Sequence, residues 1–170
     1  MGEYLILDGD LLPMLMDKGW VWVSPYGAAE KQGRPITECA RIIYDASYPR
    51  KGINLNGRSV KVDVPMKYDG PKAIARWAIA SEHAQPGTTV MMTGDVASAF
   101  RNVALHADHC GFFAGFIPEL NIIVVNLVLP FGWTNSPAYY WLAGEAIETI
   151  YGMRFMNLVW CDDHIFWRTT

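Results

Sequence analysis

Cysteine is scarce in this chain of 170 residues, and its three cysteines lie far apart. Cys39, Cys110 and Cys161 are odd in number and form no CxxC pair, which disfavours both a disulfide framework and a zinc site. Scattered thiols are typical of a reducing compartment, so we expect an intracellular protein of the cytoplasm or nucleus. We expect each thiol to pack as a small buried hydrophobic group.

Long hydrophobic runs are also missing. The longest one, residues 122–129, is interrupted by Asn126 and is far shorter than a membrane-spanning helix requires. The sequence starts without a basic segment ahead of an apolar one, so no signal peptide is evident and we expect no membrane partner. Hydrophobic residues still make up 51% of the chain, which predicts one globular domain with a core.

The chain lacks a strong net charge, since the total is only −3, but its charges are unevenly distributed. Residues 31–76 hold ten basic and four acidic residues (+6), whereas residues 102–170 hold two basic and six acidic residues (−4). A basic surface beside an acidic site suits an enzyme that handles phosphates, although an ordinary mixed surface gives the same asymmetry. The bases that could contact phosphates are Lys31, Arg41, Arg50, Lys51 and Arg58.

The order of the expected elements indicates an α+β fold. Apolar spacing, proline positions and turn residues predict these elements: a helix around residues 11–18, strands at 20–23 and 40–45, a helix at 71–82, a buried strand at 89–96, a hairpin of 110–117 with 122–129, a helix from Asn135 or Ser136 to Gly152, and a strand pair within 157–167. Because no βαβ repeat is present, we expect an antiparallel sheet backed by two helices.

Two adjacent carboxylates, Asp162 and Asp163, interrupt the last apolar run. At the turn of a hairpin they would repel each other, and a divalent cation such as Mg²⁺ or Mn²⁺ would relieve that repulsion. Asp95 closes the strand expected at residues 89–96. Three carboxylates at the ends of two strands would hold two such ions, the arrangement used for phosphoryl transfer. The alternative for the Asp-Asp pair alone is a solvated turn.

Several motifs, in this order and spacing, resemble a known enzyme family. The motifs are Gly94-Asp95-Val96-Ala97-Ser98-Ala99-Phe100, then Leu129-Pro130-Phe131-Gly132-Trp133-Thr134-Asn135-Ser136-Pro137, then Trp160-Cys161-Asp162-Asp163. They resemble the palm motifs of reverse transcriptases from long-terminal-repeat or tyrosine-recombinase retrotransposons. Residues 24–31 and 41–49 resemble the fingers strands of that family, and the resemblance covers residues 20–167.

The resemblance implies a polymerase palm with partial fingers and no thumb. Residues 1–170 would then be one fragment of a reverse-transcriptase domain, with fingers and the first palm helix up to about residue 88 and the palm in residues 89–170. The implied activity is that of an RNA-directed DNA polymerase, a nucleotidyltransferase that uses two metal ions. Its implied partners are a primer–template with an RNA or DNA template, deoxynucleoside triphosphates, and the thumb and RNase H parts of a larger polyprotein.

The resemblance also implies roles for individual residues. Asp95, Asp162 and Asp163 would be catalytic and would bind the metal ions with the Val96 carbonyl. Phe100 would exclude a ribose 2′-hydroxyl. The other implied nucleotide-binding residues are Lys31, Arg41, Phe131 and Gly132. Trp160 and Cys161 would contact the primer end, with Trp160 standing where the family usually has tyrosine.

Two other functions remain open. One is an inactive or domesticated palm fold that serves as a binding or interaction module and needs no metal. The other is a nucleotide cyclase on a similar palm, which the absence of a Gly-Gly acidic turn disfavours.

Overall fold

The computed structural model describes residues 2–31, 33–152, 156–161 and 163–169. Spatial contacts divide the chain into two compact units. Unit 1 combines Met1–Val62 with Phe100–Ser136, and unit 2 combines Asp63–Ala99 with Pro137–Thr170. The boundary expected near residues 88 and 89 separates fingers from palm by resemblance to a polymerase family, whereas these units are defined by spatial contacts. The expected boundary therefore stays a prediction.

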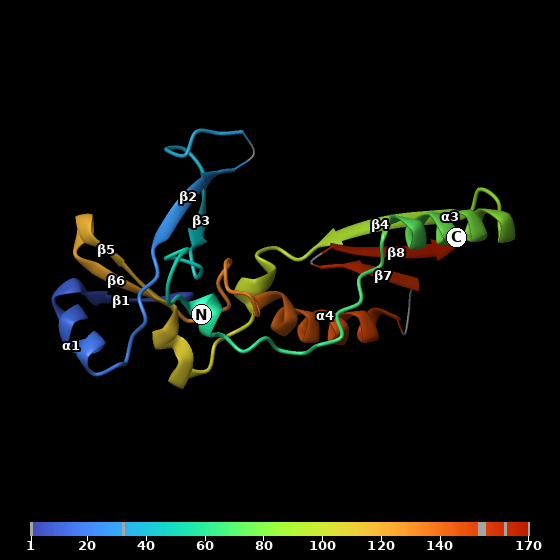
Figure 1. Cartoon of the computed structure of the whole chain (residues 1–170). Helices are drawn as coiled ribbons and strands as arrows, with labels where there is room; N and C mark the ends of the chain where they lie inside the picture. Colours follow the sequence, from blue (N-terminus) through green and yellow to red (C-terminus); the bar gives the residue numbers. More distant parts are fainter. Residues whose placement is uncertain (1, 32, 153–155, 162, 170) are drawn as a thin grey trace. The chain divides into compact units, whose positions relative to one another are not determined.

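Unit 1 contains a three-stranded antiparallel sheet in the order β1-β6-β5 and a two-stranded antiparallel ribbon, β2-β3 (Figure 1). Its elements are β1 (Tyr4–Asp8), η1 (Gly9–Leu11), α1 (Leu12–Asp17), β2 (Tyr26–Glu30), β3 (Ala40–Tyr44), α2 (Leu55–Arg58), η3 (Ala107–Phe113), β5 (Ala114–Ile117), η4 (Pro118–Leu120) and β6 (Ile122–Asn126). The expected helix at residues 11–18 and strand at 40–45 are confirmed. The expected hairpin of 110–117 with 122–129 is present with shorter strands, β5 and β6, because residues 110–113 belong to η3. The strand expected at residues 20–23 is wrong, because only Val23 forms a bridge there, to Ala114.

Helix α1 covers one face of the three-stranded sheet (Figure 1). Leu15 of α1 packs on Ala114, Ile123 and Val125, which are almost fully buried. Ile123 lies opposite Leu7 of β1 and Phe116 of β5, so it is at the centre of this sheet. A second buried cluster comprises Tyr44, Ala46, Leu55 and Phe113. It joins the end of β3 to α2 and to the end of η3.

A polar network on the other side of β6 connects distant segments of unit 1. Asn126 is 1% exposed, and its Nδ2 donates to the Tyr26 hydroxyl at 2.8 Å and to the Phe113 carbonyl at 2.9 Å. Arg101 donates to Asn126 Oδ1 at 3.0 Å and pairs with Glu3 at 2.9 Å. Burial raises the pKa of Tyr26 to about 12, so its hydroxyl stays protonated and donates to a carbonyl of β6.

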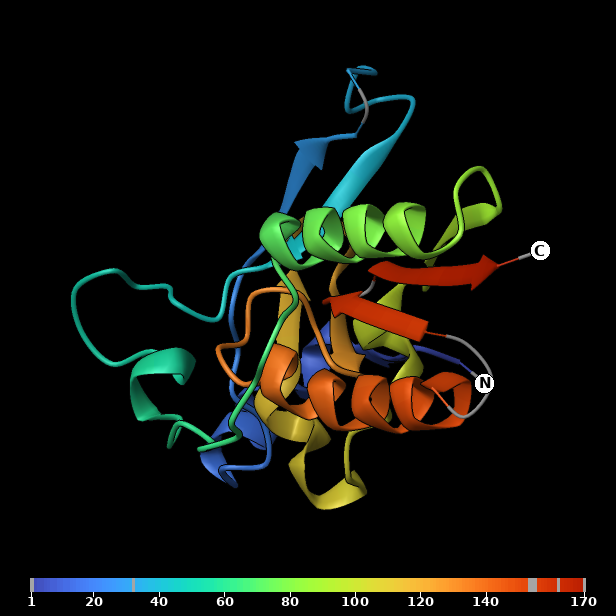
Figure 2. The ribbon, with the colours of Figure 1, turned by 90° about the vertical axis from the view of Figure 1, so that its right-hand side faces the viewer.

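Unit 2 contains an antiparallel sheet in the order β4-β8-β7, accompanied by two helices (Figure 2). Its elements are α3 (Pro71–Ala84), β4 (Thr89–Asp95), α4 (Ser136–Gly152), β7 (Met156–Trp160) and β8 (Asp163–Thr169). The helices at residues 71–82 and 136–152 and the closing strand pair are confirmed, as is the α+β class with antiparallel sheets backed by helices. Within the described residues, no helix is both long and apolar enough to cross a membrane.

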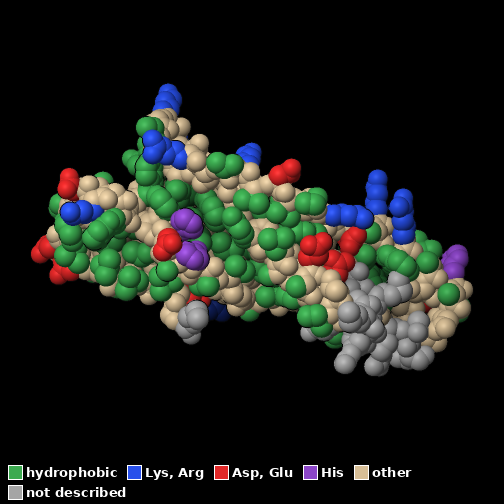
Figure 3. Space-filling model, turned by 90° about the horizontal axis from the view of Figure 1, so that it is seen from below, with side chains coloured by type: hydrophobic (Ala, Val, Ile, Leu, Met, Phe, Trp, Pro, Cys, Tyr) green, Lys and Arg blue, Asp and Glu red, His purple; other side chains and the backbone are tan. Residues whose placement is uncertain are grey.

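Strand β4 is not buried, contrary to the expectation for residues 89–96. Val90, Met91 and Met92 are 51%, 54% and 62% exposed, although successive side chains point to opposite faces. Among the described residues, β4 is the outer strand of its sheet, so no strand flanks its side chains on the edge away from β8. Hydrophobic side chains are also spread over the surface elsewhere (Figure 3). Met16 and Trp20, for example, are 55% and 62% exposed. Buried residues nevertheless occur in both units, for example Leu158, Val159 and Trp167 in unit 2.

We predict that Ile123→Ala lowers the free energy of unfolding by about 2–5 kcal/mol, because it leaves a cavity under α1. The matched control is Ile6→Ala in the neighbouring strand β1, where the side chain is 53% exposed. That change should cost about 1 kcal/mol or less. Urea denaturation followed by tryptophan fluorescence measures both values. Equal losses in the two variants would contradict the assignment of Ile123 to the core.

Candidate active site

The β4-β8 register brings two of the predicted catalytic carboxylates together. Asp95 is the last residue of β4 and Asp163 the first of β8, and the two are directly paired across the ladder. Directly opposed residues have their side chains on the same face, with Cβ atoms about 4.5–5.5 Å apart. Both are exposed. Two carboxylates in this position repel each other, so the pair favours a cation between them.

The third predicted carboxylate, Asp162, lies outside the described residues. Among the residues that the structure describes, no three His, Cys, Asp or Glu side chains gather in a group able to hold a metal ion. Asp95 and Asp163 therefore form a pair of oxygen donors on rigid strand ends. Oxygen donors of this kind suit Mg²⁺ and Mn²⁺, which take further ligands from water and phosphate.

The backbone on both sides of the carboxylate pair is tightly turned. After Asp95, the Val96 carbonyl accepts a hydrogen bond from the Ala99 N–H at 3.1 Å, and Ser98 has a φ of 55°. This bond uses one of the two lone pairs of the Val96 oxygen, so the other can still bind a cation. Before Asp163, Cys161 has a φ of 57° at the turn that follows Trp160. Trp160 pairs with Asp163 across the β7-β8 ladder.

A buried histidine lies directly behind the carboxylate pair, and the sequence reasoning missed it. His164 is 3% exposed and pairs with Gly94 across the β4-β8 ladder. Its ring stacks on Phe166, with centroids 6.1 Å apart and an interplanar angle of 9°. The strand pattern could have indicated it. If Asp163 faces solvent at the start of the strand, the next side chain, His164, must point to the opposite face.

In unit 1, two predicted nucleotide-binding rings form a contact. Phe100 and Phe131 have ring centroids 4.8 Å apart and an interplanar angle of 39°. Phe100 is 9% exposed whereas Phe131 is 44% exposed, so Phe131 still presents an open side. Gly132 follows with a φ of 108°, a conformation that favours glycine.

The predicted triphosphate-binding bases lie on the β2-β3 ribbon of unit 1. Arg41 is in β3 opposite Ala29, and Lys31 comes directly after β2. In the described part of the chain, neither Arg41 nor Lys31 belongs to an ion pair. Other bases of this segment are engaged: Arg50 forms two 2.8 Å bonds to Asp45, and Arg58 lies 5.6 Å from the ring centroid of Trp22.

Comparison with solved structures identifies the fold. The structure of a foamy viral protease–reverse transcriptase in complex with double-stranded DNA matches with a TM-score of 0.60 and 16% sequence identity. The match covers 92% of this chain and 24% of that one, so the chain spans about a quarter of the viral protein. The chain therefore has a reverse-transcriptase-like fold. No family model matches its sequence, and no curated protein does.

We predict that Asp163→Asn, measured in EDTA, raises the free energy of unfolding by up to about 1 kcal/mol, because it removes the repulsion from Asp95 across the ladder. The gain should shrink in high salt, which screens exposed charges. Thermal melting measures both effects. Asp63→Asn, at an exposed carboxylate outside the strands, is the control and should have little effect. A loss of stability in Asp163→Asn would contradict a repulsive pair.

Proposed function

We propose that the chain is the fingers-and-palm part of an RNA-directed DNA polymerase of a retroelement and belongs to a larger polyprotein. The observation that carries the proposal is the direct pairing of Asp95 with Asp163 at the ends of two strands. In a reverse-transcriptase-like fold, divalent cations bound between these carboxylates would offset their repulsion, and the same cations would serve nucleotidyl transfer. The sequence motifs around both residues support the same activity.

In the proposed reaction, Asp95, Asp162, Asp163 and the Val96 carbonyl would hold two Mg²⁺ or Mn²⁺ ions. When bound, such ions favour the deprotonated primer hydroxyl and neutralise charge on the phosphates. The donor set fits them, because the two described carboxylates offer hard oxygen ligands on adjacent strands. Asp95 and Asp163 would thus act as metal ligands and would fix the positions of the two positive ions.

The remaining residues would select and orient the substrates. Lys31 and Arg41 would bind the triphosphate, for which their lack of a described ion-pair partner suits them. The Phe100 ring would clash with a ribose 2′-hydroxyl and so select deoxynucleotides. Phe131 and Gly132 would line the nucleotide pocket.

We propose a primer–template duplex as the macromolecular partner. The foamy viral protein of similar fold was solved with double-stranded DNA, and that likeness supports nucleic-acid binding by this chain. Trp160 and Cys161, at the turn of the β7-β8 hairpin, would contact the primer end. The net charge of +6 in residues 31–76 provides the attraction for phosphates.

The test is single-nucleotide extension of a primer–template by the purified chain with Mn²⁺ and deoxynucleoside triphosphates. We predict extension that Asp95→Asn lowers at least about a hundredfold, because one carboxylate ligand of the pair is lost. The control, Asp63→Asn, should extend like the parent, since Asp63 lies outside the carboxylate pair.

Binding of Mn²⁺, followed by calorimetry, separates the possible failures. No extension with Mn²⁺ binding that Asp95→Asn weakens would indicate a genuine site that needs the rest of the polyprotein. Neither extension nor Mn²⁺ binding would contradict the proposal and favour an inert binding module.

A further inference from the structure

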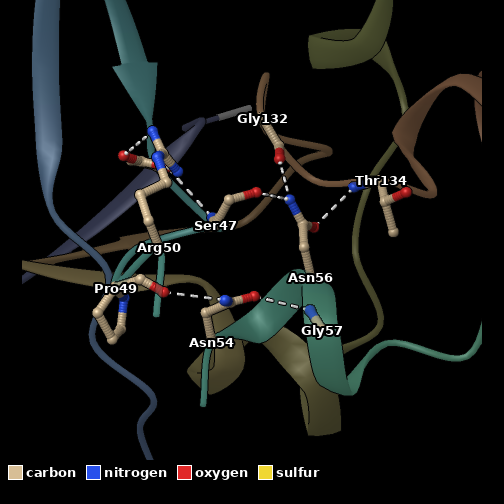
Figure 4. A network of polar contacts seen from close by, with 9 residues as sticks. Ser47, Pro49, Arg50, Asn54, Asn56, Gly57, Gly132 and Thr134 are labelled. Atoms are coloured by element: carbon tan, nitrogen blue, oxygen red, sulfur yellow. Dashed lines mark hydrogen bonds and ion pairs between the residues drawn. The ribbon is translucent and has the colours of Figure 1, made fainter. Parts of the chain in front are cut away.

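The loop that contains Phe131 and Gly132 is held in place by the amide of Asn56, a residue of helix α2 (Figure 4). Asn56 Nδ2 donates to the Gly132 carbonyl and to Ser47 Oγ, both at 2.8 Å. Asn56 Oδ1 accepts from the Thr134 N–H at 2.8 Å. One side chain therefore binds the loop on both sides of Trp133 and joins it to the segment after β3.

The loop cannot approach β3 more closely than it does. A Cβ atom added at Gly132 would collide with the carbonyl oxygen of Tyr44, the last residue of β3. Tyr44 itself is 2% exposed and belongs to the second core cluster, so it is a fixed support. The close approach to the Tyr44 carbonyl and the hydrogen bond from the Asn56 amide together restrict the position of the Gly132 backbone.

The position of Gly132 determines the position of the neighbouring ring. Phe131 lies against Phe100 with a centroid distance of 4.8 Å. Phe100 is nearly buried, whereas Phe131 is close to half exposed, so the packing around Phe131 covers only part of its ring. A loop that moved away from Asn56 would take the Phe131 ring away from Phe100.

We propose that Asn56 is a positioning residue for sugar selection by the nucleotide site. It holds the loop so that Phe131 supports the Phe100 ring against a ribose 2′-hydroxyl. This inference rests on the proposed polymerase function and adds a residue to it. Asn56 acts through the loop and is not a ligand of the nucleotide.

The chemistry of the contact requires an amide. Asn56 uses both N–H donors and its carbonyl oxygen at once. Aspartate could still accept from the Thr134 N–H, but it would place a carboxylate beside the Gly132 carbonyl with no proton between them. Asn56→Asp would therefore repel the Gly132 carbonyl, and Asn56→Ala would remove both hydrogen bonds between this side chain and the loop.

The same helix offers a matched control. Asn54 precedes α2, and its Oδ1 caps the helix by accepting from the Gly57 N–H at 2.7 Å. Aspartate is an equally good cap, so Asn54→Asp introduces the same charge and preserves α2. Its other bond, from Nδ2 to the Pro49 carbonyl at 3.0 Å, does not involve the loop (Figure 4).

The first readout is steady-state extension with a deoxynucleotide and with the matching ribonucleotide. For Asn56→Asp and Asn56→Ala we expect KM for the deoxynucleotide to rise about tenfold with kcat changed less than about threefold, as lost hydrogen bonds imply. The preference for deoxynucleotide over ribonucleotide should fall by a similar factor. Asn54→Asp should match the parent in both quantities. Variants of Asn56 that match Asn54→Asp while the parent extends primers would overturn the proposal and leave the polymerase function intact.

The second readout needs no activity. Amide hydrogen exchange at Thr134 should be faster in Asn56→Ala than in the parent and in Asn54→Asp, because its acceptor is lost. Unchanged exchange would overturn the proposal, since the amide would then not hold the loop. Faster exchange in Asn56→Ala, combined with a parent protein that binds no nucleotide, would also overturn the proposal. Asn56 would then have only a structural role, and the proposed function would have failed separately.

Discussion

The antiparallel pairing of β1 with β6 is the constraint on which unit 1 depends. It joins Tyr4 to Asn126, positions separated by 126 − 4 = 122 residues, and the Asp63–Ala99 part of unit 2 is inserted between them. Closing so long a loop costs conformational entropy, which the buried sheet must offset. The Asn126 amide fixes the end of β6 against β2 and η3 through its bonds to Tyr26 and Phe113, and Arg101 links Asn126 to Glu3 beside β1.

In unit 2, the strand register includes a pair that lowers stability. The β4-β8 ladder places Asp95 opposite Asp163, where like charges oppose folding. A strand pair selected only for stability would carry opposite charges or a polar neutral pair at this position. Unfavourable local choices of this kind concentrate at functional sites, where a ligand compensates for them. The same sheet leaves β4 exposed at Val90, Met91 and Met92, so its stability does not come from burial of that strand.

Local signals predicted much of this structure. Pro71 and Pro137 lie in the first turns of α3 and α4, and the 118–121 segment connects β5 to β6 as its composition suggests. The convergence of Asp95 and Asp163 could be expected because both end predicted strands. Strand β1 could not, since its partner lies 122 positions away, and neither could the exposure of β4, which depends on its place at the sheet edge. The contacts of Asn56 with the loop could not be predicted, because Gly132 and Thr134 lie 76 and 78 residues further along the chain.

Neutral amides, more than ion pairs, fix the parts of unit 1 that the proposed site uses. Asn56 holds the 131–134 loop, and Asn135 binds the Val60 carbonyl and the Val62 N–H. By contrast, the Arg50–Asp45 pair has an arginine side chain 67% exposed, and such pairs contribute little. Amides keep their bonds as pH and salt change, and they add no negative charge near a triphosphate. A carboxylate in the same place would stabilise the loop through one acceptor and would repel a triphosphate, so the neutral side chain suits the proposed nucleotide site better.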